Sequence, residues 1–164
     1  MKTADVIIVG SGASGLFNAL FLPQDYKVIV ITKKEVEESD SFLAQGGISA
    51  LKNPEDYDSY FEDTMKAGHY ENDKGAVEKM IKESPQIIHD LKDFGVRFDL
   101  KDGEIEFTRE GGHSTFRILH HEDLTGKEIT SHLYEEAKKR DNITIMENCT
   151  MIDIIEKDGE CKGI

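Results

Sequence analysis

The first residues with the types and spacing to do chemistry form a glycine fingerprint, Gly10-Ser11-Gly12-Ala13-Ser14-Gly15. In this spacing the first glycine makes a tight turn, the second lets backbone approach a pyrophosphate, and the third allows a helix to pack closely on a strand. Unpaired N–H groups at the start of the following helix would then face the phosphates. The fingerprint therefore predicts a turn that binds the diphosphate of a dinucleotide.

The elements that must position this turn lie on both sides of it. A run of β-forming residues, 6–9, precedes the fingerprint, and an apolar helix follows it. A second strand is expected over 28–31, and the loop after it ends in a second glycine-rich segment, Ala44-Gln45-Gly46-Gly47. This order of elements predicts a nucleotide clamp built on a parallel sheet.

The residue that follows the second strand separates two classes of dinucleotide-binding protein. An acidic side chain usually stands there and holds a ribose, but this chain has Thr32-Lys33. The simplest NAD-dehydrogenase interpretation is therefore weakened. Lys33 either covers the ligand or its phosphates as a point charge, or is a solvated lysine after a strand.

Composition and charge exclude several functions. The 164 residues are 38% hydrophobic, which together with alternating strand and helix signals indicates a single globular α/β domain. Thirty-three acidic and 20 basic residues give a net charge of −13, which repels nucleic acid and anionic membranes.

The apolar stretches are too short to span a bilayer and no signal-peptide pattern is present, so we expect a cytoplasmic protein. Cys149 and Cys161 have no CxxC spacing, which predicts neither a disulfide framework nor a zinc site.

The rest of the chain alternates helix and strand signals. We expect a helix over 53–67 and a second helix over 72–95, which Pro85 kinks or divides. A hairpin of 96–99 with 104–107 is expected around the turn Asp102-Gly103, followed by a helix over 125–139 with Thr125 as a possible cap. A strand over 143–146 should join the parallel sheet, and a strand over 152–155 should lead into a turn at Asp158-Gly159. A partner strand would begin at Cys161. Because that arm would stop at Ile164, we interpret the chain as a truncated segment.

Other polar groups are weaker candidates for chemistry. Glu110 is either a surface carboxylate or a ligand-binding group, and the neighbouring Gly111-Gly112 allow backbone to approach a ligand. His113 is a general base by type. The run His120-His121-Glu122-Asp123 has metal-ligating types, but adjacent side chains point to different sides, and no metal site is expected. Ser11, Ser14 and Ser114 lack the context of a nucleophile elbow.

Three segments carry a family resemblance. These are Ser39-Asp40-Ser41-Phe42-Leu43-Ala44-Gln45-Gly46-Gly47-Ile48, Thr108-Arg109-Glu110-Gly111-Gly112-His113-Ser114 and Asp123-Leu124-Thr125-Gly126. The chain resembles the L-aspartate oxidases, which belong to the flavoprotein group of succinate dehydrogenase and fumarate reductase, over essentially its whole length. The resemblance implies a Rossmann-like α/β FAD-binding fold with a parallel sheet and a β-hairpin extension. Residues 1–164 would be the N-terminal part of the FAD-binding domain, without the capping and C-terminal helical domains.

The resemblance also implies which residues hold the cofactor. FAD would be contacted by the fingerprint, by Lys33, by the loop Asp40 to Gly47, and by Thr150-Met151 through backbone groups. The respiratory relatives attach FAD covalently through a histidine in that loop, where this chain has Asp40-Ser41, so noncovalent FAD is expected. Asp40 departs from the small neutral residue common at its position, and an anion there is unfavourable unless it points away.

The activity implied is the oxidation of L-aspartate to iminoaspartate, with oxygen or fumarate as acceptor. Glu110 would orient the substrate through its α-ammonium group, whereas the proton-transfer arginine and the carboxylate-binding histidines would lie beyond Ile164. Iminoaspartate would feed quinolinate and NAD biosynthesis, which implies a functional link to quinolinate synthase. Two alternatives stay open: a soluble fumarate reductase or succinate dehydrogenase-type flavoprotein, and an FAD-binding fragment without catalysis.

Overall fold

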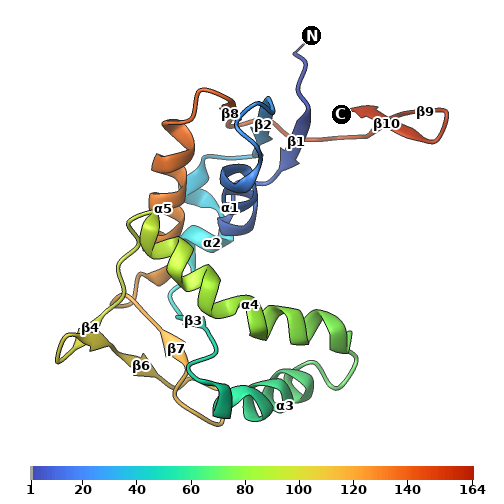
Figure 1. Cartoon of the computed structure of the whole chain (residues 1–164). Helices are drawn as coiled ribbons and strands as arrows, with labels where there is room; N and C mark the ends of the chain where they lie inside the picture. Colours follow the sequence, from blue (N-terminus) through green and yellow to red (C-terminus); the bar gives the residue numbers. More distant parts are fainter. Residues whose placement is uncertain (1) are drawn as a thin grey trace. The chain divides into compact units, whose positions relative to one another are not determined.

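The structure is a computed structural model that describes residues 2–164, and its elements are shown in Figure 1. It divides into two compact units. We call Met1–Ala44 with Gly126–Ile164 the sheet unit, and Gln45–Thr125 the insert unit. Among the described residues, no helix has the length and apolar character needed to cross a membrane.

The sheet unit contains the predicted parallel sheet. Strands β1 (Val6–Val9), β2 (Val28–Ile31) and β8 (Ile143–Met146) pair in the order β1-β2-β8, with Val28 opposite both Val6 and Ile143. All four residues of the central strand are buried, as a continuous Val/Ile run predicts for a strand between two neighbours. The prediction of three parallel strands is confirmed.

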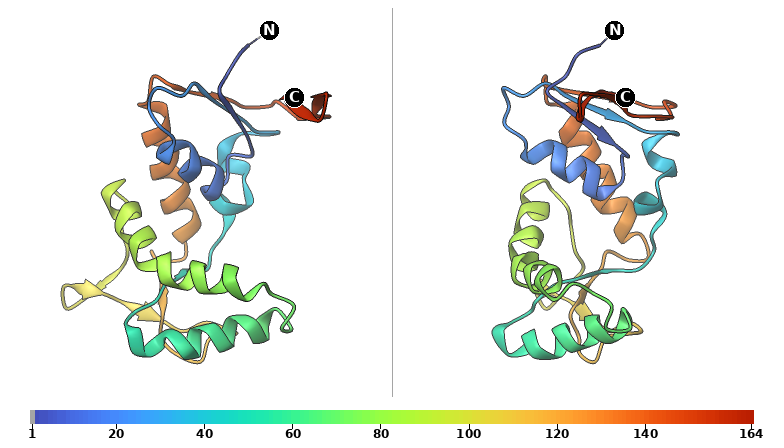
Figure 2. Two further views of the ribbon diagram at one scale, coloured as in Figure 1. Left: turned by 45° about the vertical axis from the view of Figure 1, so that its right-hand side comes forward. Right: turned by 90° about the vertical axis from the view of Figure 1, so that its right-hand side faces the viewer.

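Two helices cover one face of this sheet (Figure 2). Helix α1 (Ala13–Phe21) starts within the fingerprint, and helix α5 (Thr125–Lys138) precedes β8. The connections from β1 to β2 through α1 and from β2 to β8 through α5 move in the same direction across the sheet. Because such connections are right-handed, both helices lie on the same face. The core between the layers contains Ala19, Val28 and Val30, surrounded by half-buried Ile8, Leu22, Ile143 and Ile145.

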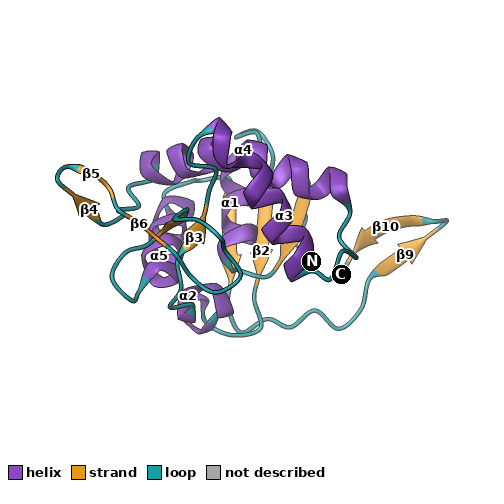
Figure 3. Ribbon diagram, turned by 90° about the horizontal axis from the view of Figure 1, so that it is seen from below, coloured by secondary structure: helices purple, strands orange, loops and turns teal. Residues whose placement is uncertain are grey.

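The remaining elements of the sheet unit are short. A 3-10 turn η1 (Val36–Glu38) and helix α2 (Asp40–Leu43) follow β2, and strands β9 (Ile155–Lys157) and β10 (Glu160–Gly163) form an antiparallel hairpin. Figure 3 shows this hairpin projecting from the parallel sheet. The turn at Asp158-Gly159 is confirmed, with φ angles of 58° and 79°.

The prediction of a strand over 152–155 is wrong in its position. The strand begins at Ile155, and Ile152 is 94% exposed. The turn places Lys157 opposite Glu160, and the last pair of this hairpin is Ile155 with Gly163. The partner strand begins at Glu160, one residue before the expected start, and in the described residues the pairing of this hairpin ends at Ile155.

The insert unit holds a small antiparallel sheet and a hairpin. Strands β3 (Ile48–Ser49), β7 (Ile118–Leu119) and β6 (Phe107–Thr108) pair in the order β3-β7-β6, and β4 (Leu100–Lys101) pairs with β5 (Glu104–Ile105). The predicted turn at Asp102-Gly103 is present, but the expected arm over 96–99 is not a strand. The turn sets the register of this hairpin, and the short partner arm β5 ends opposite Leu100, so the pairing does not extend back to 96–99. Val96 and Phe98 have buried side chains instead.

Two helices complete the insert unit and confirm the expected helical segments. The 3-10 turn η2 (Pro54–Asp56) leads into α3 (Tyr57–Ala67), and Asp73 caps α4 (Lys74–Asp93) by accepting the N–H of Ala76 at 2.8 Å. Pro85 lies inside α4 without dividing it, and the ribbon bends along this helix in Figures 1 and 2.

The continuity of α4 across Pro85 has a local cause. Proline lacks the N–H that would reach the carbonyl of Ile81, four residues earlier. The hydroxyl of Ser84 donates to that carbonyl at 2.7 Å. The hydroxyl oxygen of Ser84 also accepts the N–H of Leu51 at 2.8 Å. Ser84 therefore satisfies the backbone group that Pro85 leaves unpaired and joins α4 to the segment after β3.

Candidate functional site

The predicted phosphate turn lies at the end of β1. Gly10 adopts a φ of 110°, which glycine tolerates without a steric penalty, and donates its N–H to the carbonyl of Ile31 at 2.8 Å. A Cβ on Gly15 would lie 2.1 Å from the carbonyl oxygen of Gly10. Helix α1 thus packs directly on the turn, which is the close contact that the third glycine of the spacing predicts.

Free donors gather at the start of α1. Its N-cap is Gly12, no side chain caps it, and its first turn contains no acidic residue. Ser11 is 2% exposed, and its hydroxyl has no hydrogen-bond partner within residues 2–164. A buried polar group left unpaired costs about 1–3 kcal/mol. A polar ligand atom beside this turn would remove that penalty.

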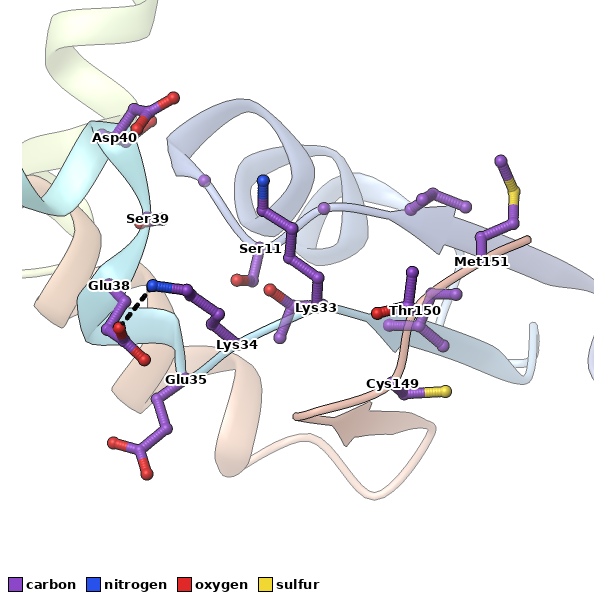
Figure 4. A pocket seen from close by; sticks show the side chains of 16 residues that line it. Ser11, Lys33, Lys34, Glu35, Glu38, Ser39, Asp40, Cys149, Thr150 and Met151 are labelled. Carbon is purple, nitrogen blue, oxygen red and sulfur yellow. Dashed lines mark hydrogen bonds and ion pairs between the residues drawn. The ribbon is translucent and has the colours of Figure 1, made fainter.

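A cavity of about 390 Å³ opens beside the turn (Figure 4). Its walls come from the carboxyl ends of β1 and β2, from the segment 33–41, and from Cys149–Met151. In open parallel sheets, ligands bind outside the carboxyl ends of the strands. The cavity brings together predicted contact residues that are far apart in sequence: Gly10, Ser11, Gly12, Lys33, Asp40, Ser41, Thr150 and Met151.

The charged side chains at this cavity differ in orientation. In Figure 4 the Lys33 side chain extends beside Ser11 and the fingerprint, whereas Asp40 lies at the edge of the view, on the segment that carries Ser39. Lys34 pairs with Glu38 at 2.8 Å on the surface. Lys33 has no ion-pair partner in the part of the chain that the structure describes, so it is the cation available to a ligand in the cavity.

The segment after β8 closes the cavity on the side of β2. The N–H of Cys149 donates to the carbonyl of Thr32 at 2.9 Å, which fixes the backbone leading into Thr150 and Met151. Both residues line the cavity.

Several predicted contact residues lie outside this cavity. Ser14 and Gly15 line a neighbouring hollow together with Gly12 and Ser41, and Ala13 lines neither. Phe42, Leu43 and Ala44 also line neither, and the ammonium of Lys127 lies 5.8 Å from the centroid of the Phe42 ring. Gln45, Gly46 and Gly47 belong to the insert unit.

Within the insert unit, Glu110 lies against the second glycine-rich segment. Its Oε1 accepts the N–H of Gly47 at 3.1 Å, and a Cβ on Gly46 would lie 3.3 Å from its Oε2. The N–H of His113 donates to the carbonyl of Glu110 at 3.2 Å, and Gly112, with a φ of 85°, occupies the position of that turn that favours glycine. The two motifs that sequence analysis singled out separately thus meet at the exposed carboxylate of Glu110.

A buried arginine next to this turn was missed by sequence analysis. Arg117 has no exposed surface, and its guanidinium pairs with Asp56 at 2.8 Å and with Asp63 at 2.6 Å. Hydrogen bonds from Arg117 lower the pKa of Asp56 from its ordinary 3.8 to about 2. Burial opposes ionisation of Asp63, but hydrogen bonds from Ser114 and Arg117 outweigh it and hold the pKa of Asp63 below its ordinary value.

The sequence signal for this buried arginine was a charged residue inside the apolar run Phe116-Arg117-Ile118-Leu119, together with two acids seven residues apart in a segment expected to be helical.

The adjacent histidines share one carboxylate. Nδ1 of His120 lies 3.1 Å from Asp99 Oδ2, and Nδ1 of His121 lies 3.3 Å from Asp99 Oδ1. Across residues 2–164, no group of three or more His, Cys, Asp or Glu side chains is arranged to hold a metal ion. Thr125, expected as a helix cap, accepts the N–H of His121 through its hydroxyl at 3.0 Å.

Comparison with protein families matches residues 5–164 to the FAD binding domain. This chain belongs to that family. FAD is the cofactor that the family implies, and the cavity of the sheet unit suits such a ligand: it offers an unpartnered buried hydroxyl, an uncapped helix start and an unpaired lysine.

Curated relatives of this FAD binding domain are L-aspartate oxidases. The chain is 43% identical over 162 residues to the L-aspartate oxidase of Clostridium perfringens, covering 99% of this chain and 37% of that protein. It is 46% identical over 160 residues to the enzyme of Clostridium acetobutylicum, covering 97% of this chain and again 37% of that protein. The chain therefore spans little more than a third of the length of these relatives.

Solved structures of respiratory flavoproteins have the same fold. Mycobacterium smegmatis Sdh1 superposes with a TM-score of 0.85 at 28% identity, covering 98% of this chain and 30% of that one. A variant of E. coli quinol fumarate reductase FrdA superposes with a TM-score of 0.89 at 25% identity, covering 96% and 28%. The predicted α/β FAD-binding fold is confirmed.

Proposed function

We propose that this chain is the FAD-binding part of an L-aspartate oxidase, which converts L-aspartate to iminoaspartate with oxygen or fumarate as the final acceptor. The observation that carries the proposal is the position of Glu110, whose carboxylate is held at the second glycine-rich segment by the N–H of Gly47. The names and the 43% and 46% identities of the clostridial relatives support it. Bound FAD supplies the acceptor for the hydride that leaves the α-carbon of the substrate.

Several segments of the chain are assigned to the cofactor. In the sheet unit, Ser11 and the start of α1 bind the diphosphate, Lys33 adds a positive charge, and Thr150-Met151 contact the adenine side through backbone groups. The loop residues Asp40 to Gly47 are assigned to FAD as well. The loop contains no histidine, so FAD is held noncovalently.

The charge of Glu110 selects the substrate. L-aspartate and succinate share two carboxylates, and only aspartate carries an α-ammonium group. A carboxylate that meets this ammonium makes a charge-assisted hydrogen bond to aspartate and repels a plain dicarboxylate. Glu110 thus orients the amino-acid substrate, while FAD supplies the redox chemistry.

The wider assignments follow from this activity. The complete enzyme contains a capping domain and a C-terminal helical domain in addition to this FAD-binding part. It works in the cytoplasm, and its product feeds quinolinate synthase in NAD biosynthesis. With a net charge of −13, the chain does not take nucleic acid as a partner.

An anaerobic absorbance titration of the complete enzyme with bound FAD tests the proposal. Loss of the flavin band on adding L-aspartate, but not on adding succinate, is the expected result. A second candidate, a soluble fumarate reductase, is favoured by the TM-score of 0.89 to the E. coli fumarate reductase. Bleaching by succinate, or no bleaching by aspartate, would decide against the oxidase.

Replacing Glu110 tests its role directly. Glu110→Gln removes the negative charge and keeps the size, and the loss of a hydrogen bond to a charged group, about 1.5–3 kcal/mol, predicts a rise in the KM for aspartate of roughly 10- to 100-fold. The KM for fumarate should change little, because fumarate has no ammonium group. Glu104→Gln, on the exposed hairpin strand β5, is the matched control and should leave both values unchanged. Equal rises for both substrates would contradict the assigned role.

A further inference from the structure

The five N–H donors of Arg117 are all engaged. Nε donates to Asp56 Oδ2 at 2.9 Å, and NH2 donates to Asp56 Oδ1 at 2.8 Å and to Ser59 Oγ at 2.7 Å. NH1 donates to Asp63 Oδ2 at 2.6 Å and to His113 Nδ1 at 3.1 Å. The guanidinium also lies over the ring of Tyr60, 4.8 Å from its centroid. A fully buried cation with no free donor is a fixed point in the insert unit.

The acids that hold Arg117 also hold the chain just before it. Asp63 Oδ2 accepts both the N–H and the hydroxyl of Ser114 at 2.7 Å, and Asp56 Oδ1 accepts the hydroxyl of Thr115 at 2.7 Å. Three consecutive residues, His113 to Thr115, are therefore tied to η2, α3 and Arg117. The turn that carries Glu110 ends at the first of these residues.

The contact between Arg117 and His113 also selects one form of the imidazole. A guanidinium has only donors, so Nδ1 of His113 must present its lone pair. The ring proton then resides on Nε2. The edge of Tyr60 packs near this ring, with centroids 6.1 Å apart and planes at 60°, which limits its rotation. His113 is thus held in a single orientation at the end of the Glu110 turn.

We propose that Arg117 and Asp63 are positioning residues that hold the Glu110 turn in the geometry that binds the amino-acid substrate. This inference rests on the proposed substrate role of Glu110. The turn is fixed at one end by the hydrogen bond from Gly47 to Glu110, and at the other end by the bonds from Arg117 and Ser114. Glycines at 111 and 112 leave the intervening backbone intrinsically mobile, so the two fixed ends define where the carboxylate stands. Without the anchor, substrate binding would have to order the turn, and the KM for aspartate would rise.

The variant that tests this arrangement is Asp63→Ala. It removes the acceptor of Ser114 and leaves Arg117 paired with Asp56 through two hydrogen bonds, so no buried charge is left alone. Asp58→Ala, which removes an exposed carboxylate from the same helix, is the matched control. Ser114→Ala is a milder second variant that loses only the hydroxyl contact to Asp63.

The kinetic test is a double-mutant cycle in the complete enzyme. Asp63→Ala is expected to raise the KM for aspartate about 3- to 10-fold with little change for fumarate, and to add nothing further in a Glu110→Gln background, because both changes act on one contact. Ser114→Ala should produce a smaller change in the same direction. A rise that is the same with and without Glu110→Gln, or the same for both substrates, would assign the cluster a purely structural role and overturn the proposal.

A second measurement separates failure of this inference from failure of the proposed function. Amide hydrogen exchange of residues 110–114, followed by mass spectrometry on the substrate-free enzyme, is expected to be at least several-fold faster in Asp63→Ala and unchanged in Asp58→Ala. If the parent enzyme does not oxidise aspartate, the proposed function fails, and the exchange result still decides whether Asp63 anchors the turn. Unchanged exchange in Asp63→Ala would overturn the positioning role whatever the substrate.

Discussion

At the scale of single residues, the unpartnered hydroxyl of Ser11 leads to the first prediction. Ser11→Ala should weaken FAD binding by roughly 10- to 100-fold, since a hydrogen bond to a charged group is worth about 1.5–3 kcal/mol, without lowering the stability of the FAD-free protein. Thr130 has the same kind of buried hydroxyl without a partner, in helix α5 and outside the cavity. Thr130→Val is therefore the control, and fluorescence titration with FAD measures both. Equal losses of affinity would show that the Ser11 hydroxyl does not meet the cofactor.

The low pKa of Asp56 predicts a dependence of stability on pH. Because the carboxyl has a pKa of about 2 in the folded protein and an ordinary value of 3.8, the unfolded chain binds more protons between these values. The stabilisation by the Arg117 pair is fully present above the upper value and is lost as the pH falls toward 2. Urea unfolding of the parent protein should therefore become easier more steeply below pH 4 than that of Asp56→Asn. Parallel pH profiles would contradict this assignment.

Local motifs made part of the site predictable at the residue scale. The fingerprint and the Gly46-Gly47 segment are recognisable because short-range spacing alone defines a turn. The network of Arg117 with Asp56 and Asp63 was not, because its partners lie more than fifty positions away in sequence, and their seven-residue spacing does not by itself identify Arg117 as the partner.

At the scale of secondary structure, the continuity of α4 depends on Ser84. Ser84→Ala should destabilise the protein by about 1–3 kcal/mol, because the buried carbonyl of Ile81 and the N–H of Leu51 both lose their partner. The double variant Ser84→Ala/Pro85→Ala restores a backbone N–H for Ile81, so it should recover part of that loss. Urea unfolding followed by circular dichroism measures both, and the absence of recovery would reject this account of the helix.

The helices and the parallel strands were predictable, and the exact positions of the hairpin strands were not. The helices α3, α4 and α5 and the three parallel strands follow from apolar periodicity and from cap residues such as Asp73. The two hairpins were displaced along the chain, although their turns were placed correctly. Their registers depend on the length of the partner arm, as at Ile155 and Leu100, and this is a property of pairing rather than of local sequence.

At the scale of the whole molecule, the two compact units predict a pattern of proteolysis. The connections between the units include exposed residues at 45–46 and at 122–124, whereas α3 and α4 each contribute buried side chains to the core of the insert unit. A broad-specificity protease at low concentration should therefore cut first near these connections and leave residues of the insert unit as one resistant fragment. Mass spectrometry identifies the cuts, and first cuts inside α3 or α4 would contradict the division.

The boundaries of the units are not recognisable as a linker in the sequence. Neither junction is rich in proline, and the glycines at 46 and 47 are shared with the predicted ligand-binding loop, so they do not by themselves mark a boundary between units.

The two ends of the sheet unit meet where the insert unit begins and ends: the N–H of Gly126 donates to the carbonyl of Ala44 at 3.1 Å, and a Cβ on Gly126 would lie 2.1 Å from the carbonyl of Ser41. This junction has a consequence for folding kinetics. Strand β8 must pair with β2 across a long intervening segment of chain. The entropic free-energy cost of closing a flexible loop rises by about 0.6 kcal/mol for each doubling of the loop length. If the insert unit collapses first, it brings Ala44 and Gly126 together and shortens the effective loop. The parallel sheet would then nucleate late, after the segment inserted into it has folded.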